Sequence, residues 1–430
     1  MANPTNRWHV DAAAAAGSRG GGGTAAPRQS MKNDKLLILA IFVVVVGAVV
    51  GIQHFRPSGG RGGIRRQLLV PPAPVRRVDV AQMRGFSLQL QSASPSRPYD
   101  KYIGEIADAG ANTICLVVAA YQENGGSTSI FVDARRVPTD ERLGRLIALA
   151  RRKGLRVVLM PIVLLDNPRA GEWRGQIEPK GWAKWWDKYN GYILRYARIA
   201  QQGGVDVFMV GSELVSTEKD HAPRWRRLIR EVRGVFKGCL SYSANWDHYR
   251  PVSWWDEIDI VGMTTYYDLT KGKQPTVQRL LASWQPIRRD VLAWQRTINR
   301  PILFTEVGWP NQVTCAQYPW DYTRNPDKPD PTAQANCFEA FFRTWIREPS
   351  VAGFLVWEWR NAPGQDTGPK DTGYVPCGKP AMKVIQKYYQ MPGAEPKATR
   401  PAASQPATAR SAPATAPATR PAPAPATARN

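Results

Sequence analysis

The segment Arg300-Pro-Ile-Leu-Phe-Thr-Glu-Val-Gly-Trp309 is typical of a buried β-strand that ends on a carboxylate. Pro301 can begin such a strand, the apolar run Ile302 to Thr305 favours it, and Gly308 ends it. Glu306 therefore lies where the strand meets its loop. A buried charge without a partner costs several kcal/mol. This Glu is therefore either salt-bridged at a strand end or a catalytic carboxylate at the mouth of a barrel.

The same pattern recurs along the chain, because apolar runs alternate with amphipathic stretches eight times. The predicted strands are Gly85–Leu90, Thr113–Ala119, Arg156–Val163, Val205–Gly211, Leu240–Ala244, Ile258–Thr264, Ile302–Thr305 and Gly353–Trp357. The predicted helices are Asp100–Ala109, Glu141–Lys153, Trp182–Gln202, Trp225–Phe236, Val277–Arg296, Ala333–Arg347 and Ala381–Tyr389. This alternation indicates an α/β fold, the (β/α)8 TIM barrel, over residues 79–390. The active site of that fold lies at the carboxyl ends of the strands.

Carboxylates follow two predicted strands that face each other across the barrel. The fourth strand ends in Val210-Gly-Ser-Glu-Leu214, so Glu213 stands at its end as Glu306 stands at the end of the seventh. Retaining glycoside hydrolysis needs two carboxyls about 5–5.5 Å apart, one as nucleophile and one as acid/base. Aromatic residues, which can stack on sugar rings, follow several other strands. The pattern predicts a carbohydrate-active site with Glu213 and Glu306 as its catalytic pair.

Motifs along the barrel resemble those of clan A glycoside hydrolases, and more narrowly those of glycoside hydrolase family 113, whose members include endo-β-1,4-mannanases. The resemblance spans about residues 84–390 and rests on Trp182-Ala-Lys-Trp185, Gly211-Ser-Glu-Leu214, Leu240-Ser-Tyr-Ser-Ala-Asn-Trp246, Trp255-Asp-Glu-Ile-Asp-Ile-Val-Gly262, Tyr266-Tyr267, Phe304-Thr-Glu-Val-Gly308 and Gly378-Lys-Pro-Ala381. It implies that Glu213 is the acid/base and Glu306 the nucleophile. Ser212 departs from the pattern, since much of clan A has there an Asn that contacts the sugar 2-hydroxyl. Its shorter hydroxyl changes how that position is recognised.

Further residues at strand ends and in nearby loops are predicted to bind substrate: Tyr266, Trp357, Trp246, Asn245, Arg174 and Trp309. Tyr266 is a candidate to hydrogen-bond the nucleophile, or only to form the wall of the cleft. Trp357 could form the floor of the −1 subsite or pack in the core. Arg174 could contact substrate or form a surface ion pair. Glu358 alternates away from Trp357 and is interpreted as structural. The acid/base Glu213 should have a raised pKa, because it is buried near another negative charge.

Four segments outside the barrel differ from it in composition. They are a disordered segment over 1–35, a transmembrane signal anchor over 36–52, a Gly/Arg/Pro-rich linker over 53–78 and a disordered Ala/Pro/Thr/Arg-rich tail over 391–430. The proposed anchor has seventeen residues without a charge, and no clear small-x-small cleavage site follows it. We therefore expect a membrane-anchored protein whose barrel is exported to the periplasmic or extracellular side. Translation could begin at Met1 or at Met31.

The formal net charge of +23 does not by itself indicate a nucleic-acid-binding protein. Residues 1–78 carry +9 and residues 391–430 carry +4, while the Arg residues between them are scattered along predicted helices. Solvated helix faces and membrane-proximal arms explain this distribution better than a DNA groove. We therefore expect a carbohydrate substrate and the membrane as partners, no nucleic acid, and a monomer.

The sequence contains no motif for a metal or a cofactor. The four His residues show no ligand spacing and no Gly-rich phosphate loop is present, so we expect neither a catalytic metal nor a cofactor. Cys115 is predicted to be buried and free. Two of Cys315, Cys337 and Cys377 could form a disulfide if the domain is exported, and the sequence does not choose between them.

Two functions of different kind fit these patterns. The first is a retaining glycoside hydrolase that cleaves a β-linked polysaccharide or oligosaccharide, of mannan type first. The second is a catalytically silent barrel that binds carbohydrate or has a structural role in the cell envelope. The presence of both Glu213 and Glu306 favours the enzyme.

Overall fold

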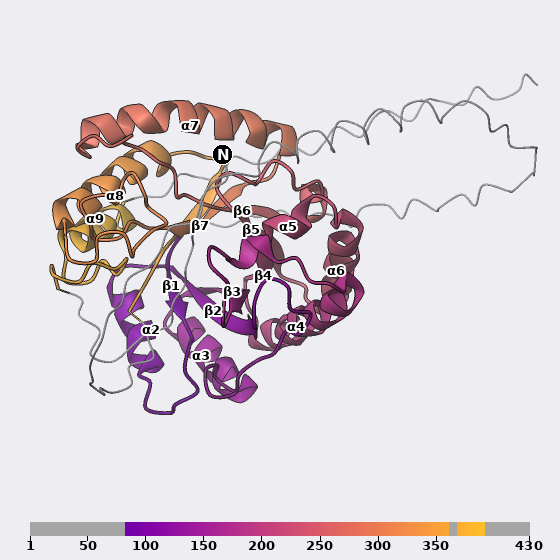
Figure 1. The fold of residues 1–430 in the computed structure, drawn as a ribbon. Coiled ribbons are helices and arrows are strands. Elements are labelled where there is room, and N and C mark those ends of the chain that lie inside the picture. The colour runs from indigo at the N-terminus through magenta and orange to yellow at the C-terminus, as the bar shows by residue number, and fades with distance from the viewer. Residues whose placement is uncertain (1–81, 361–367, 392–430) are drawn as a thin grey trace, which may run out of the picture. The chain divides into compact units, whose positions relative to one another are not determined.

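The computed structural model describes residues 82–360 and 368–391. In this part of the chain eight parallel strands pair in sequence order, and the first pairs with the eighth to close a barrel (Figure 1). The strands are β1 (Met83–Gln89), β2 (Thr113–Gln122), β3 (Arg156–Leu165), β4 (Val207–Ser212), β5 (Cys239–Ala244), β6 (Ile260–Thr264), β7 (Ile302–Val307) and β8 (Val351–Val356). The TIM barrel predicted from the sequence is confirmed, with all eight strands in their predicted order.

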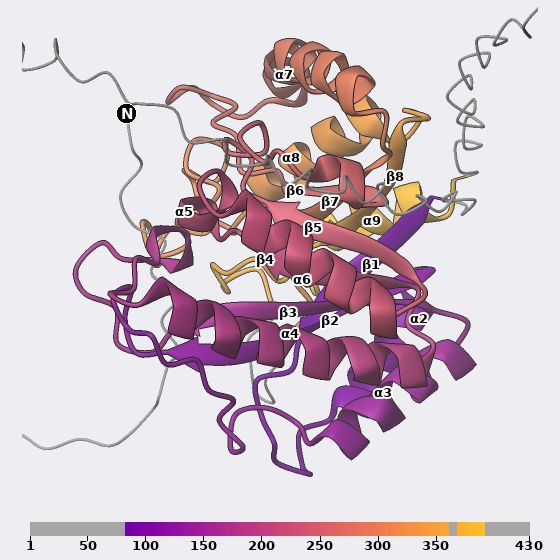
Figure 2. The same cartoon turned by 90° about the vertical axis from the view of Figure 1, so that its right-hand side faces the viewer.

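Helices surround the strands, and they follow the amphipathic stretches of the sequence (Figure 1). They are α2 (Tyr99–Asp108), α3 (Asp140–Arg152), α4 (Trp182–Gly203), α5 (Val215–Glu218), α6 (Ala222–Val235), α7 (Val277–Ile298), α8 (Pro331–Trp345) and α9 (Pro380–Tyr389), with short 3-10 helices η1 (Arg174–Gln176) and η2 (Trp255–Glu257). In both views α4 and α6 lie side by side along one flank of the barrel (Figure 2). Among the described residues, the four-residue helix α5 shortly after β4 is the one α-helix without a counterpart among the sequence predictions.

The strands are buried along almost their whole length, because their side chains face either the barrel interior or the helices. β2 and β3 run further than predicted, and Gln122, the polar residue that ends β2, is itself buried. Tyr121 there also forms a bridge to Phe131 in the following loop. The two longest strands therefore extend the wall of the barrel on one side of its mouth.

Irregularities of strand pairing lie beside the predicted catalytic residues, among them a shift in the β6–β7 register that pairs Thr264 with Glu306. The β4–β5 register shifts between Met209 and Ser212, one residue before Glu213. The β7–β8 register shifts between Phe304 and Val307, a span that contains Glu306. Such irregularities change the direction of a side chain and are frequent next to active sites. They lie in the strands that carry the two carboxylates.

The predicted segments 1–35, 36–52 and 53–78 and the tail after Met391 lie outside the described residues. Within residues 82–360 and 368–391 no helix has the length and apolar character needed to cross a membrane. All five cysteines belong to the described part and none is in a disulfide. The buried thiols of Cys315 and Cys337 form a hydrogen bond, and burial raises the pKa of Cys337 well above its ordinary value. A disulfide among the three predicted cysteines stays a prediction.

Candidate active site

Glu213 follows the last residue of β4 and is buried at the carboxyl end of the barrel. Its φ of 51° lies in the left-handed region, which costs a non-glycine residue about 1–3 kcal/mol. Its backbone N–H donates to the carbonyl of Ser243 on β5 at 2.8 Å. Neighbouring strand β5 thus holds Glu213 in a conformation that the isolated chain would avoid.

Glu306 is the penultimate residue of β7 and is also fully buried. The hydroxyl of Tyr266, in the loop after β6, donates to Glu306 Oε2 at 2.9 Å. The hydrogen bond predicted from the sequence is therefore present. The hydroxyl of Thr265 donates to the Glu306 backbone carbonyl at 2.9 Å. Both the carboxyl and the backbone of Glu306 are thus fixed by the segment that follows β6.

Arg174 connects the two carboxyl groups. Its Nη2 donates to Glu213 Oε2 at 2.6 Å and lies 3.7 Å from Glu306 Oε1. The exposed fractions of the Arg174, Glu213 and Glu306 side chains are 3%, 1% and 0%. The alternative of a surface ion pair for Arg174 is wrong, because this ion pair lies in the interior of the barrel mouth.

Arg174 lies in η1, a 3-10 helix in the loop between β3 and α4. The neighbouring Gly175 lies directly against the Trp173 ring, since a Cβ added there would lie 2.3 Å from it. Ser216, at the start of α5, donates to the carbonyl of Ile177 at 2.6 Å and ties this loop to the segment after Glu213. The cation therefore reaches the carboxylates from a loop that packs beside them.

Burial and mutual repulsion determine the charge of the pair. Burial raises the pKa of both Glu213 and Glu306, and the negative charge of Glu213 raises the pKa of Glu306 further. The Arg174 guanidinium opposes this effect at both groups, as does the Tyr266 hydroxyl at Glu306. Two carboxylates next to one cation in a dry site favour a state in which the pair shares one proton.

The distances to Arg174 also limit the separation of the carboxyl oxygens. Because the same Nη2 atom lies 2.6 Å from Glu213 Oε2 and 3.7 Å from Glu306 Oε1, these two oxygens are at most about 6.3 Å apart. Retaining glycosidases hold their carboxyl groups about 5–5.5 Å apart, and inverting ones about 6.5–9.5 Å. The upper limit on this oxygen pair is thus compatible with the spacing of retaining enzymes.

Comparison with known proteins identifies the family of this barrel. The profile of Glycoside Hydrolase Family 113 matches residues 97–379, which include both Glu213 and Glu306. The chain belongs to glycoside hydrolase family 113. It is thus a glycoside hydrolase by family, as the resemblance of its motifs implied, and carbohydrate is its substrate class.

Solved structures agree with this family 113 assignment. The family 113 β-mannanase AaManA from Alicyclobacillus acidocaldarius, solved in complex with ManMIm, has a TM-score of 0.64 and 26% identity, covering 72% of this chain and 98% of its own. A family 113 β-1,4-mannanase has a TM-score of 0.64 and 25% identity, covering 72% and 99%. A family 5 mannosidase from Rhizomucor miehei, at 12% identity and a TM-score of 0.52, shares the fold over 73% of this chain and 94% of its own. No curated protein matches the chain.

β8 of this family 113 barrel brings a third carboxyl group to the mouth. Trp357 is buried directly after β8, and the peptide bond to Glu358 is cis. Glu358 accepts a hydrogen bond from Gln89 at the end of β1, and burial raises its pKa to about 7. Its charge also raises the pKa of Glu306. Glu358, interpreted as structural from the sequence, therefore influences the electrostatics of the site.

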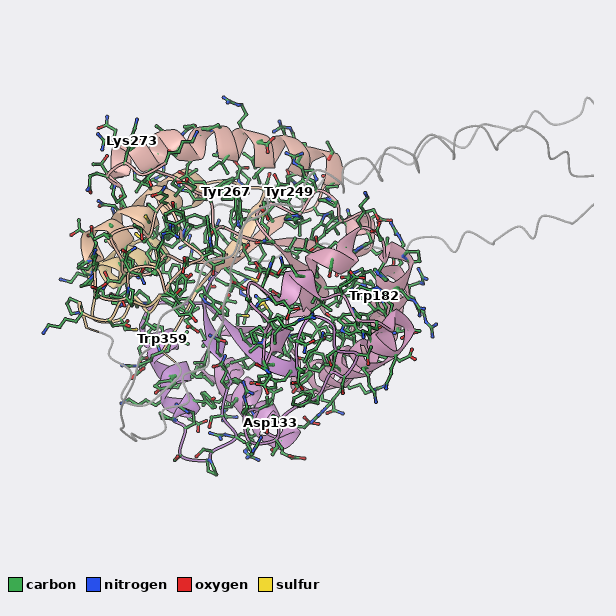
Figure 3. All side chains as sticks on the ribbon, viewed as in Figure 1. Asp133, Trp182, Tyr249, Tyr267, Lys273 and Trp359 are labelled. Carbon is green, nitrogen blue, oxygen red and sulfur yellow. The ribbon has the colours of Figure 1, made fainter. Side chains whose placement is uncertain are left out.

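Asn245 and Trp246 lie beside the carboxyl end of β6, and their predicted contact with substrate stays a prediction. The Trp246 backbone N–H donates to Thr264 Oγ1 at 3.0 Å and to Asn245 Oδ1 at 3.1 Å. The Trp246 ring stacks on Trp320, with centroids 6.2 Å apart and planes inclined by 15°. It also contacts Tyr267, which is labelled in Figure 3. The Tyr267 ring packs edge-on against Trp284 of α7. Trp246 and Trp320 are both half-buried and form an aromatic platform from the loops after β5 and β7.

Trp309 does not belong to this platform. Its side chain is fully buried, and its ring packs against Phe338 and Phe341 of α8. The prediction of a cleft residue is wrong for Trp309, because the chain after β7 turns this indole into the layer between strand and helix. The aromatic residue of this loop that stacks on Trp246 is Trp320, eleven residues later, which sequence reasoning missed. Its neighbours Tyr318 and Tyr322 give the segment an aromatic character that could have indicated it.

The family 113 barrel presents no evident metal centre in its described part. Within residues 82–360 and 368–391 no group of three or more His, Cys, Asp and Glu residues is placed to hold a metal ion.

Proposed function

We propose that this protein hydrolyses β-1,4-linked mannan with retention of configuration, by double displacement. The observation that carries the proposal is the Arg174 contact, which holds two buried carboxyl oxygens within about 6.3 Å of each other at opposed strand ends. The substrate class is supported by the likeness to solved family 113 β-mannanases at about 25% identity. The roles of Glu213 as acid/base and Glu306 as nucleophile are those that the resemblance implied, and their positions directly after β4 and at the end of β7 support them.

In the first step the ionised Glu306 attacks the anomeric carbon, and the glycosidic C–O bond breaks. Glu213 gives its proton to the leaving oxygen, so the pair must enter the reaction with one shared proton. The raised pKa of Glu213 suits this role, because the acid must stay protonated until the bond breaks. The Tyr266 hydroxyl holds the attacking carboxylate in place.

In the second step Glu213 acts as a base. Once Glu306 is esterified it carries no charge, so its repulsion of Glu213 disappears and the pKa of Glu213 falls. The Arg174 guanidinium, 2.6 Å away, stabilises the resulting carboxylate. Glu213 then takes a proton from water, which attacks the anomeric carbon and releases the sugar with its original configuration.

The 2-hydroxyl of the sugar would be contacted differently here than in much of clan A, because Ser212 replaces the usual Asn. The hydroxyl oxygen of Ser212 is buried beside Glu213 and has no hydrogen-bond partner within the described residues. It is therefore available to a substrate hydroxyl. We propose that Ser212 contacts the −1 sugar from β4, with Trp357 on β8 as the floor of that subsite.

The test is a substrate screen of the full chain on β-mannan, β-glucan, xylan and aryl β-glycosides, with NMR detection of the anomer formed first. We expect turnover of β-mannan and first release of the β-anomer. The Glu306→Gln variant, purified in parallel, is the matched control for contaminating activity. First release of the α-anomer would contradict retention. Glycan binding without turnover on any substrate would favour the catalytically silent barrel.

The aromatic platform gives a separate prediction on substrate length. Trp320→Ala should raise KM for mannan about tenfold and leave kcat nearly unchanged, because it removes one stacking surface and leaves the hydrogen bonds and ion pairs of Glu213 and Glu306 in place. An aryl β-mannoside that occupies only the −1 subsite is the control and should keep its KM. Equal KM changes on both substrates would show that Trp320 supports the catalytic centre instead.

A further inference from the structure

The backbone after Glu213 is fixed by a chain of hydrogen bonds that ends on a buried carboxyl group. The N–H of Leu214 donates to the hydroxyl of Tyr242 at 2.9 Å. That hydroxyl in turn donates to Glu218 Oε1 at 2.6 Å. Together with the Glu213 N–H bond to Ser243, two consecutive peptide groups around the proposed acid/base are held by residues of β5.

Each member of this chain is buried. Tyr242 has no exposed surface and Glu218 exposes 1%. The Tyr242 ring packs edge-on against Trp225 and Trp254, which fixes the direction of its hydroxyl. Loss of the Tyr242 hydroxyl would therefore leave the Leu214 N–H unsatisfied in the interior.

A carboxyl group is unusual at the position of Glu218, because the side chain is buried. Burial raises its pKa to about 8, so it carries its proton at neutral pH. Its second oxygen, Oε2, has no hydrogen-bond partner within the described residues. An apolar side chain would avoid the cost of burying these polar atoms. The contact that Glu218 does make is the one that orients Tyr242, and through Tyr242 the Leu214 peptide group.

We propose that Tyr242 and Glu218 are positioning residues for the acid/base Glu213, which they hold in its left-handed conformation so that its carboxyl group reaches the leaving oxygen. This inference rests on the proposed function. Neither residue touches the reacting atoms; they act on the peptide group that follows Glu213. Because proton donation depends on distance and direction, a small rotation at Glu213 should impair protonation more than nucleophilic attack by Glu306.

Leaving-group dependence tests this inference. kcat/KM, which reports the first step, is measured on two aryl β-mannobiosides, one releasing dinitrophenol and one releasing phenol. Dinitrophenolate leaves without a proton, whereas phenol needs the acid. Tyr242→Phe and Glu218→Leu should each lower kcat/KM about 10- to 100-fold on the phenyl substrate, which is part of what a positioned general acid contributes. On the dinitrophenyl substrate the change should stay below about threefold.

Two further variants separate positioning from folding. Glu218→Gln keeps an acceptor oxygen for Tyr242 and should retain activity on both substrates, and it remains informative if Glu218→Leu does not fold. Tyr389→Phe removes an equally buried hydroxyl that donates to the Gly85 carbonyl at 2.7 Å on β1. It matches the loss of one buried hydrogen bond and should leave the ratio of the two kcat/KM values unchanged.

Each outcome has a distinct meaning. Equal losses on both substrates in a folded Tyr242→Phe protein, or no loss on either, would overturn the positioning role while leaving the proposed function intact. A Glu218→Gln variant as impaired as Glu218→Leu would also contradict it, because the acceptor is kept. Absence of turnover by the wild-type protein on every β-mannoside would overturn the proposed function itself, and the positioning role with it.

Discussion

Replacing Glu306 by Gln should lower kcat on β-mannan roughly 10⁵-fold or more, on the scale seen when a nucleophile is removed from a covalent catalytic unit. The amide cannot form the glycosyl ester, while it keeps the size of the side chain and an acceptor for the Tyr266 hydroxyl. The measurement is reducing-sugar release by the full chain. Glu257→Gln is a matched control, since Glu257 is a largely buried carboxylate just before β6, at the opposite end of the barrel.

The variant Glu213→Ala should show which of the two Glu residues is the acid/base and which is the nucleophile. On the dinitrophenyl substrate it should form the glycosyl-enzyme and then stall, because no base activates water. Azide needs no base and should restore turnover with the β-mannosyl azide as product. Restored turnover by azide in Glu306→Ala with that same β-product would reverse the assignment of roles. Near-normal kcat on mannan in both variants would exclude this site as the catalytic centre.

Removing Arg174, the cation that contacts both Glu213 and Glu306, should have the second-largest effect on catalysis. Arg174→Met should lower kcat/KM about 10²–10³-fold, comparable to the loss of one preorganised charge-stabilising group. Arg174 lowers the pKa of both Glu213 and Glu306, so its removal raises both. The acidic limb of the pH profile reflects protonation of the nucleophile, and the basic limb reflects loss of the proton from the acid. Both limbs should therefore move to higher pH.

The pH profile of kcat/KM for wild type, Arg174→Met and Arg174→Lys measures this shift. The Lys variant keeps the charge and should move less than the Met variant. Arg226→Met is the control, because Arg226 pairs with Asp256 and Glu257 away from the site. A profile that moves to lower pH in Arg174→Met, or stays unchanged, would show that Arg174 does not set the charge of the pair.

The fold and the carboxylate pair were accessible from the sequence because both depend on local pattern. Each strand is a short apolar run, and a charge at its end is visible in the chain. Closure of the barrel then brings Glu213 and Glu306 together without any further information. The Tyr266 hydrogen bond followed from the same logic, since its strand β6 is the neighbour of β7.

The remaining features depend on packing between distant segments. Arg174 lies in a loop without periodicity, and only the tertiary fold shows that it reaches the carboxylates. Trp309 was misplaced because it follows β7, where its direction depends on packing against Phe338 and Phe341 of α8. The left-handed backbone of Glu213 has no glycine or asparagine to indicate it. The role inferred for Glu218 likewise needs the Tyr242 hydroxyl, which comes from a different strand.

The closed sheet and the loop that carries Arg174 have different consequences for how such an enzyme can diversify. The separation of Glu213 and Glu306 is set by the number and tilt of the strands, so it should survive exchange of the loops around them. The segment 308–330, which supplies Trp320, can therefore change to admit other sugar chains at little risk to the reaction. The segment 166–181 is different, because an exchange there removes the cation as well. The loop proposed to bind the sugar chain can thus be exchanged separately from the loop that carries Arg174.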